Sequence, residues 1–230
     1  MNRSIVAGVD GYPGGWVCFQ VDIASRSTDV QLLDLPAALL NRPLGWAAVA
    51  IDIPIGLLDG SRSCDRAARK LLGPVRGCSV FSAPCRAALL AQDYQEACEM
   101  NRQRTGRKLS QQAWCICPKI KVVDHAISTA SQQWAFEVHP EVCFWAMNDR
   151  IPMAHGKKTQ EGKAERLTLL TKHFPAIKDH VLHRPPRVGV DDLIDAAAAA
   201  WSALRIYDGT AQCVWQAERD DRGLEVAIRY

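Results

Sequence analysis

Apolar residues recur in short runs through the first part of the chain, at the length of β-strands. The first run covers residues 3–10 and ends in an Asp-Gly turn that leads into a stretch rich in glycine and proline. Two further runs, residues 16–23 and 28–35, follow at hairpin spacing. This pattern predicts a meander of three antiparallel strands.

A short helix and a fourth strand follow the meander. Pro36 suits the first turn of a helix over residues 37–41, and the apolar run over residues 46–52 has strand length. The order is therefore three strands, a helix and another strand. An aspartate stands at the carboxyl end of the first strand and of the fourth, namely Asp10 and Asp52.

The next seventy residues change character. Residues 61–130 carry helical periodicity without strand alternation, and they predict helices over residues 64–72, 87–104 and 120–130. We interpret this segment as a helical insertion that caps one face of the sheet.

Strand character returns over residues 134–138 and precedes a predominantly helical region. The predicted elements are a helix that opens in the basic segment 157–166 and ends near residue 173, a loop over 175–189, a helix over 193–207 and a hairpin formed by 212–218 and 223–230. Alternating strands and helices of this kind predict an α/β fold with a mixed sheet flanked by helices. We expect the 230 residues to form one domain.

The cysteine content favours a reducing compartment. Nine cysteines, an odd number, are scattered along the chain without a secretory signal before them, so we expect free thiols in a cytoplasmic protein. No CxxC pair is present, which disfavours structural zinc. No apolar run is long enough to cross a bilayer.

Four aspartates form the strongest chemical pattern. Asp10 and Asp52 would lie side by side if their strands are neighbours, and Asp192 and Asp195 share one face near the start of the late helix. Carboxylates a few ångströms apart repel one another, and a hard cation such as Mg²⁺ or Mn²⁺ relieves that repulsion. Each aspartate taken singly is an ordinary turn or cap residue; their joint placement favours a metal site.

Glu137 and His139 extend this pattern in one of two ways. Strand alternation points Glu137 away from the face of Phe136 and Val138. If that face looks toward the aspartates, Glu137 is a fourth catalytic carboxylate and His139 is a proton carrier. The alternative is a cross-strand ion pair and a turn histidine.

Basic residues are informative only where they cluster, because a formal net charge of +3 is too weak to imply nucleic-acid binding. The predicted phosphate-contacting residues are Lys157, Lys158, Lys163 and Arg166, with a second contact at Lys119 and Lys121 near Trp114. The alternative is a solvated helix face. The stretch from Gly156 lacks the earlier glycine of a P-loop.

Four motifs in this order resemble a known family. They are GVDGYPGGW at residues 8–16, IDIPIGL at 51–57, EVHPE at 137–141 and DDLIDA at 191–196. The chain resembles domain-of-unknown-function family 429, described as predicted ribonuclease-H-like nucleases. The resemblance extends over nearly the whole chain and includes SVFSAP at residues 79–84.

The resemblance implies a ribonuclease-H-like fold and phosphodiester hydrolysis of DNA or RNA. In that superfamily the carboxylates lie on the first strand, the fourth strand and a late helix, which correspond here to Asp10, Asp52 and the pair Asp192 and Asp195. The implied chemistry uses two metal ions roughly 4 Å apart, with Asp10 bridging them. Resolvase-like members often carry glutamate where this chain has Asp52.

Other functions remain as alternatives. One, suggested by the weak net charge, is a catalytically silent nucleic-acid-binding or regulatory protein on the same fold. That fold also occurs in actin-like and sugar-kinase-like phosphotransferases, which normally use two such domains. Cys85 and Cys143 lie near motif residues and are candidate nucleophiles, although free cysteines are more often buried apolar residues. The sequence leaves open whether the chain forms a homodimer.

Overall fold

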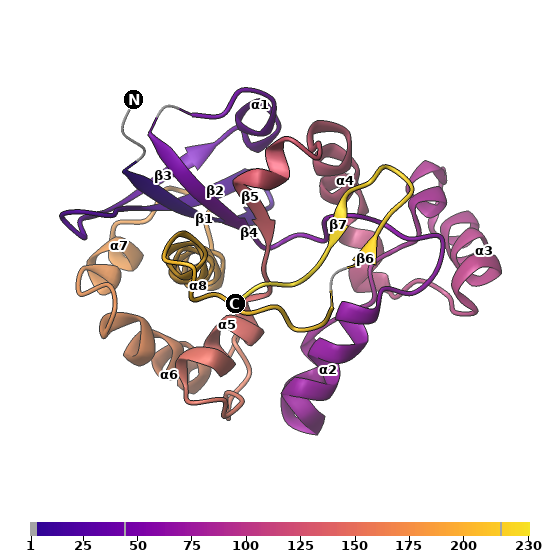
Figure 1. The fold of residues 1–230 in the computed structure, drawn as a ribbon. Helices are drawn as coiled ribbons and strands as arrows, with labels where there is room; N and C mark the ends of the chain where they lie inside the picture. Colours follow the sequence, from indigo (N-terminus) through magenta and orange to yellow (C-terminus); the bar gives the residue numbers. More distant parts are fainter. Residues whose placement is uncertain (1–3, 44, 217) are drawn as a thin grey trace.

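A five-stranded sheet forms the centre of the computed structural model, which describes residues 4–43, 45–216 and 218–230 (Figure 1). The strands lie in the order β3-β2-β1-β4-β5. Strands β1, β2 and β3 pair antiparallel, whereas β4 pairs parallel with β1 and with β5. Their bounds are β1 Ile5–Tyr12, β2 Gly15–Asp22, β3 Thr28–Leu33, β4 Trp46–Ile51 and β5 Ala135–Glu137. The predicted α/β fold with a mixed sheet is confirmed, and it is consistent with a ribonuclease-H-like arrangement.

The first strand pairs over different lengths on its two sides. On the β2 side, pairing continues past Asp10, which lies opposite Val17, to the end of the strand at Tyr12. On the β4 side, the ladder stops at Val9 and Ile51. Asp10 is therefore inside one ladder and just beyond the other. Residue 3, with which the predicted first strand began, lies outside the described residues, as does residue 44 in the predicted loop.

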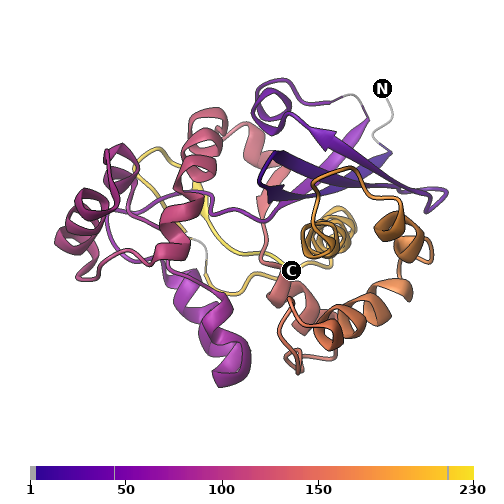
Figure 2. The same cartoon turned by 180° about the vertical axis from the view of Figure 1, so that it is seen from behind.

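The long helix α8, Val190–Tyr207, lies directly against one face of the sheet. Its alanine-rich run allows a close approach to Gly8 of β1, where an added Cβ would lie 2.0 Å from the Ala196 carbonyl oxygen and the Ala200 nitrogen. The helices α5, α6 and α7 curve around the far side of α8 (Figures 1 and 2). Helix α8 is therefore enclosed between the sheet and this layer, and most of its residues are buried.

The other face of the sheet is covered by α1 and α4. Apolar side chains of these helices, such as Leu35 and Ile120, form a common core with Val9 and Val49 from the sheet. With helices on both faces, the central strands are almost wholly buried, which is why they read as continuous apolar runs.

The helix bounds differ from the predicted ones where capping residues intervene. Asp93 accepts a hydrogen bond from the Glu96 nitrogen and starts α3 there, so the long helix predicted over residues 87–104 is a 3-10 turn followed by α3. Ser110 caps α4 in the same way, well before the predicted start at residue 120. The helices are α1 Leu35–Leu40, α2 Ser63–Arg76, α3 Tyr94–Thr105, α4 Gln111–Ala126, α5 Pro140–Met147, α6 Gln160–Thr171, α7 Ile177–Leu182 and α8, with 3-10 turns at Gly77–Ser79, Arg86–Leu90 and Ser131–Gln133.

The end of the first predicted helix of the insertion is confirmed. Gly73, whose φ is 62°, is not helical and separates it from a short helical segment that completes α2. The segment 175–189, predicted as loop-rich, contains the short helix α7. Residues 61–130 are helical and irregular, as predicted, and their description as an insertion within one domain stays a prediction.

The chain ends in a small hairpin and a tail. Strands β6, Glu218–Arg219, and β7, Glu225–Val226, pair antiparallel over two residues each, which is shorter than the predicted hairpin. Beyond them the Arg229 nitrogen donates to the Glu137 carbonyl oxygen at 3.0 Å, so the tail runs beside β5. In the part of the chain that the structure describes, no helix has both the length and the apolar character needed to cross a membrane.

Candidate metal centre

The strand ladder between β1 and β4 places two aspartates next to each other. Pairing ends at Val9 and Ile51, and the Asp52 nitrogen still donates to the Val9 carbonyl oxygen at 2.9 Å. The next residue of each strand is an aspartate, so Asp10 and Asp52 emerge together where the two parallel strands end. Asp10 is buried and Asp52 is partly buried.

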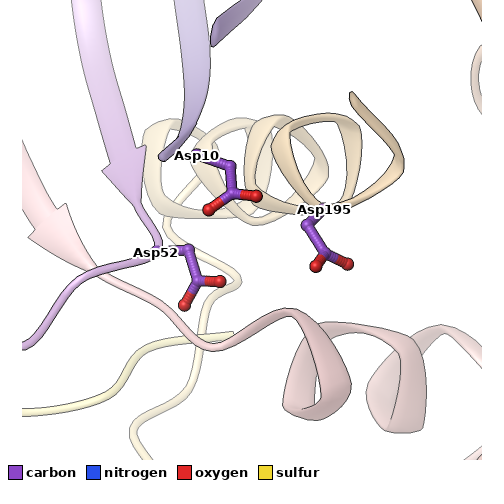
Figure 3. A group of neighbouring side chains, drawn as sticks. All are labelled: Asp10, Asp52 and Asp195. Carbon is purple, nitrogen blue, oxygen red and sulfur yellow. The ribbon is translucent and has the colours of Figure 1, made fainter. Parts of the chain in front are cut away.

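The third carboxylate comes from α8. Asp195 is 1% exposed and lies in the second turn of the helix, opposite the ends of the two strands. Figure 3 shows the side chains of Asp10, Asp52 and Asp195 converging from the two strand ends and the helix. One ligand oxygen from each lies within 4.8 Å of the others. We call these three residues the acidic triad; it is a set of oxygen ligands that could hold a metal ion.

Burial and mutual repulsion disfavour the charged forms of two of the carboxylates in the acidic triad. Burial, followed by the charges of Asp52 and Asp195, raises the pKa of Asp10 well above its ordinary value. Burial and the charge of Asp195 raise the pKa of Asp52 to about 7. The Lys157 ammonium lies 2.5 Å from an Asp195 carboxylate oxygen and offsets part of this repulsion. Lys157 pairs directly with one of the three carboxylates, and the site favours a further cation.

Asp10 and Asp52 of the triad line a pocket with a cavity volume of about 220 Å³. Lys119 lines one side of this pocket. Its ammonium donates to the Gly15 carbonyl oxygen at 2.6 Å and lies 4.5 Å from the centre of the Trp16 ring. Two lysines line the pocket, and each belongs to a different predicted group of phosphate-contacting residues. Lys157 comes from the group in residues 157–166, and Lys119 comes from the second contact.

Asp192 lies at the rim of the pocket but outside the triad. It accepts a hydrogen bond from the Gly189 nitrogen at 2.9 Å and so caps the start of α8. Of the two late aspartates predicted as ligands, the structure brings Asp195 to the strand ends and leaves Asp192 one turn back along the helix.

Glu137 lines the same pocket, but its carboxylate interacts with residues outside the triad. One carboxylate oxygen lies 2.5 Å from the Arg62 guanidinium, and the other accepts from the Ile55 nitrogen at 2.7 Å. The ion-pair alternative therefore describes Glu137, although its partner lies at the start of α2 and not on a neighbouring strand. Glu137 is not a fourth member of the triad among the described residues.

His139 follows Glu137 in the chain and faces the pocket. Its Nδ1 is buried and has no hydrogen-bond partner among the described residues. Burial lowers the pKa of His139, so the imidazole is neutral near pH 7 and has a nitrogen able to accept a proton.

The remaining predicted basic residues lie elsewhere. Lys158 is exposed and does not line the pocket. Arg166 is 1% exposed and pairs with Glu141 at 2.5 Å. Arg166 does not line the pocket, and its guanidinium is occupied by the buried Glu141, so its role in substrate binding stays a prediction that the structure gives no contact to support.

Sequence reasoning missed the partners of the buried ions. Arg62 bridges Glu137 and Asp65, which lies 3.3 Å from the guanidinium. Only the fold brings Arg62 beside Glu137, so no local spacing could have paired them. The cysteine alternative loses support, because burial raises the pKa of Cys143 to about 12 and keeps this thiol protonated.

Fold and site together define a class: an α/β protein with a ribonuclease-H-like sheet arrangement and a buried acidic group that could bind a metal. The chain belongs to the family described as "Protein of unknown function (DUF429)", which matches residues 8–220. This match includes all four motifs that carry the predicted resemblance and confirms the predicted family. No curated protein and no solved structure matches the chain.

Proposed function

We propose that this protein is a divalent-metal-dependent nuclease that hydrolyses phosphodiester bonds of DNA or RNA. The observation that carries the proposal is the convergence of Asp10, Asp52 and Asp195. Two of them, Asp10 and Asp52, line a pocket, and Asp195 lies buried beside them. Carboxylates from two strand ends and one helix leave their outer oxygens free for a ligand, which a purely structural ion cluster does not need.

The residues present fit Mg²⁺ or Mn²⁺. The triad offers only carboxylate oxygens, which hard cations prefer, and it has neither thiolate nor imidazole ligands. The raised pKa values of Asp10 and Asp52 are further support, because burial and the neighbouring carboxylates disfavour the charged forms, which a bound cation would stabilise. When bound, such an ion stabilises charge on a phosphoryl oxygen and lowers the pKa of a water molecule.

The chain's own residues would position the substrate and move protons. Lys157 holds the Asp195 carboxylate at 2.5 Å, and Lys119 extends along the pocket wall, where its ammonium can meet a phosphate. The unpartnered Nδ1 of neutral His139 can accept a proton in the pocket. The three residues surround the triad and leave its outer side open.

The test combines metal binding with cleavage. We expect Mn²⁺ to bind the wild-type protein in calorimetry and Asp10→Asn to abolish binding, since one of three ligands is lost. We expect Mg²⁺- or Mn²⁺-dependent cleavage within a panel of single-stranded, duplex, hybrid and branched nucleic acids, reduced by about a thousandfold or more in Asp10→Asn.

The matched control is Asp191→Asn, which removes one carboxylate from the first turn of α8 outside the triad. This variant should bind Mn²⁺ and cleave like the wild type. Absence of metal-dependent cleavage across the whole panel would overturn the nuclease proposal. Mn²⁺ binding without cleavage would favour a nucleic-acid-binding or regulatory protein on the same fold.

A further inference from the structure

A second cavity, of about 400 Å³, lies between α2, α3 and α4. No acidic residue lines it among the described residues, whereas basic, hydroxyl and amide side chains do. We call it the cationic groove; its polar lining comprises Arg69, Arg107, Lys108, Ser61, Ser82, Thr105, Ser110, Asn101 and Gln112.

The cationic groove shares a wall with the pocket of the acidic triad. Val80 and Phe81 line both cavities. They belong to SVFSAP at residues 79–84, a motif of the chain that the metal centre does not use. A ligand chain that leaves the triad across Phe81 therefore enters the groove directly.

This shared wall is fixed from both sides. Arg69 donates to the Val80 carbonyl oxygen and to the Ser82 hydroxyl oxygen, each at 2.6 Å. The Ala83 nitrogen donates to buried Asp65 at 2.9 Å. Phe81 is only half-buried on this rigid support, so its ring offers an apolar surface between the two cavities.

The far side of the groove carries exposed positive charge. Arg107 and Lys108 are both exposed and stand in the loop between α3 and α4. The loop itself is ordered, because Asn101 donates to the Arg107 carbonyl oxygen at 2.8 Å. The positive end of the α4 dipole, capped by Ser110, lies at the same place. Cations, hydroxyls and a helix start together suit phosphate oxygens.

We infer that the substrate of this protein is a polynucleotide with a single-stranded segment beside the scissile phosphate. One base of that segment stacks on Phe81, and the following phosphates lie along Arg107 and Lys108. The inference rests on the proposed nuclease function for the scissile phosphate alone. The groove needs no metal, so single-stranded nucleic acid binds to it with or without Mn²⁺.

The test measures binding apart from cleavage. Short fluorescein-labelled oligo(dT) and oligo(U) are titrated by anisotropy in EDTA at several salt concentrations. The double variant Arg107→Gln with Lys108→Gln should weaken binding about tenfold, and it should reduce the salt slope by about 1.4, the loss expected for two contacts to a single strand. The matched control, Lys172→Gln with Lys178→Gln, removes two exposed charges on the α6 and α7 side and should bind like the wild type.

A second variant tests the stacking surface. Phe81→Leu keeps an apolar side chain in the wall and should weaken binding of the single strands about tenfold, with an unchanged salt slope, because stacking carries no charge. Thermal unfolding of each variant shows that the fold is retained. Duplex DNA that binds as tightly as the single strands would overturn the inference.

Cleavage separates the inference from the proposed function. The groove variant should raise the KM for a cleaved oligonucleotide while leaving Mn²⁺-dependent hydrolysis of bis(p-nitrophenyl) phosphate unchanged, since that small diester cannot span both cavities. If the wild type hydrolyses neither substrate, the nuclease proposal fails while the anisotropy result still decides the groove. If the groove variant binds both oligonucleotides like the wild type, the groove inference fails.

Discussion

Two groups of carboxylates at the pocket differ in their partners. In the acidic triad, the Lys157 ammonium pairs with Asp195 and acts on Asp10 and Asp52 through its charge. In the other group, Glu137 and Asp65 flank the Arg62 guanidinium, and we call these three residues the arginine cluster. Asp10 and Asp52 of the first group and Glu137 and Asp65 of the second line one cavity. Among the described residues, both carboxylates of the arginine cluster have an ion-pair partner within 4 Å, whereas in the triad only Asp195 has one.

Hydrogen bonds widen the difference. Each acid of the arginine cluster also accepts from a backbone nitrogen, Glu137 from Ile55 at 2.7 Å and Asp65 from Ala83 at 2.9 Å. Within the described residues, no such donor reaches the Asp52 carboxylate. A buried carboxylate is therefore no mark of function by itself. What marks the triad is Asp52: Asp10 accepts from the Gly11 nitrogen at 2.7 Å and Asp195 pairs with Lys157, but among the described residues the Asp52 carboxylate has neither kind of partner.

The largest effect expected from this comparison is on the arginine cluster. Arg62→Met should lower the free energy of unfolding by about 3 to 5 kcal/mol, because it leaves two buried carboxylates without their cation. Urea denaturation measures this loss. Adding Glu137→Gln to the same chain should restore part of the stability, since it removes one of the uncompensated charges.

Arg66→Met is the control for that variant. Arg66 lies on the exposed side of α2, where its contact is the Ser63 hydroxyl at 3.0 Å. Its loss should change the unfolding transition little. Equal losses for Arg62→Met and Arg66→Met would mean that the arginine cluster does not stabilise the fold.

Neutralising Asp52 of the triad should instead raise the free energy of unfolding, by less than the loss expected for Arg62→Met. The pKa of Asp52 is raised to about 7, so the metal-free folded protein binds more protons than the unfolded chain between about pH 4 and pH 7. Its stability therefore falls as pH rises through that window. Asp52→Asn removes the titrating group and should gain about 1 to 2 kcal/mol over the wild type above pH 7, since solvent in the pocket screens part of the repulsion.

The gain should vanish near pH 4, where Asp52 is protonated in the folded protein. Urea denaturation in EDTA across this range measures it. A gain that is constant with pH would show that the amide stabilises the fold for a reason other than charge, and a loss at pH 7 would mean that Asp52 has a structural partner.

A third variant tests the ammonium that pairs with Asp195 of the triad. Lys157→Met should lower the stability of the metal-free protein by about 1 kcal/mol, because the lysine is partly exposed and its ion pair is screened. The same change should tighten Mn²⁺ binding several-fold, because the ammonium no longer competes with the metal for Asp195. Calorimetry on Lys157→Met and on exposed Lys158→Met separates this effect from a general loss of charge. Weaker Mn²⁺ binding in Lys157→Met would mean that the lysine helps to hold the metal site together.

Much of the fold could be predicted from the chain itself. The apolar runs that became β1, β2 and β4 are long enough to indicate strands, and their order with α1 determines a mixed sheet. The ends of the helices were harder to predict from the sequence. Asp93 and Ser110 are ordinary polar residues in the sequence, and only their hydrogen bonds to Glu96 and Ala113 make them caps.

The part of the site that depends on strand pairing could be predicted. Asp10 and Asp52 each come directly after the last paired residue of the parallel ladder, Val9 and Ile51, so their proximity depends on strand order alone. Pairing of Arg62 with Glu137 depends on where α2 packs, which no local pattern records. The choice between the late aspartates depends on the rotation of α8, which its contact with Gly8 determines.

The smallest effect on stability and Mn²⁺ affinity is expected for Asp192, the late aspartate outside the triad. Asp192 accepts from the Gly189 nitrogen at 2.9 Å, and an asparagine oxygen can accept the same hydrogen bond. Asp192→Asn should therefore change the free energy of unfolding by less than about 0.5 kcal/mol and the Mn²⁺ affinity by less than about threefold. Asp195→Asn, one turn further along α8, should abolish Mn²⁺ binding. Calorimetry on the two variants decides the assignment, because equal losses of Mn²⁺ affinity would make Asp192 a ligand and extend the triad to four carboxylates.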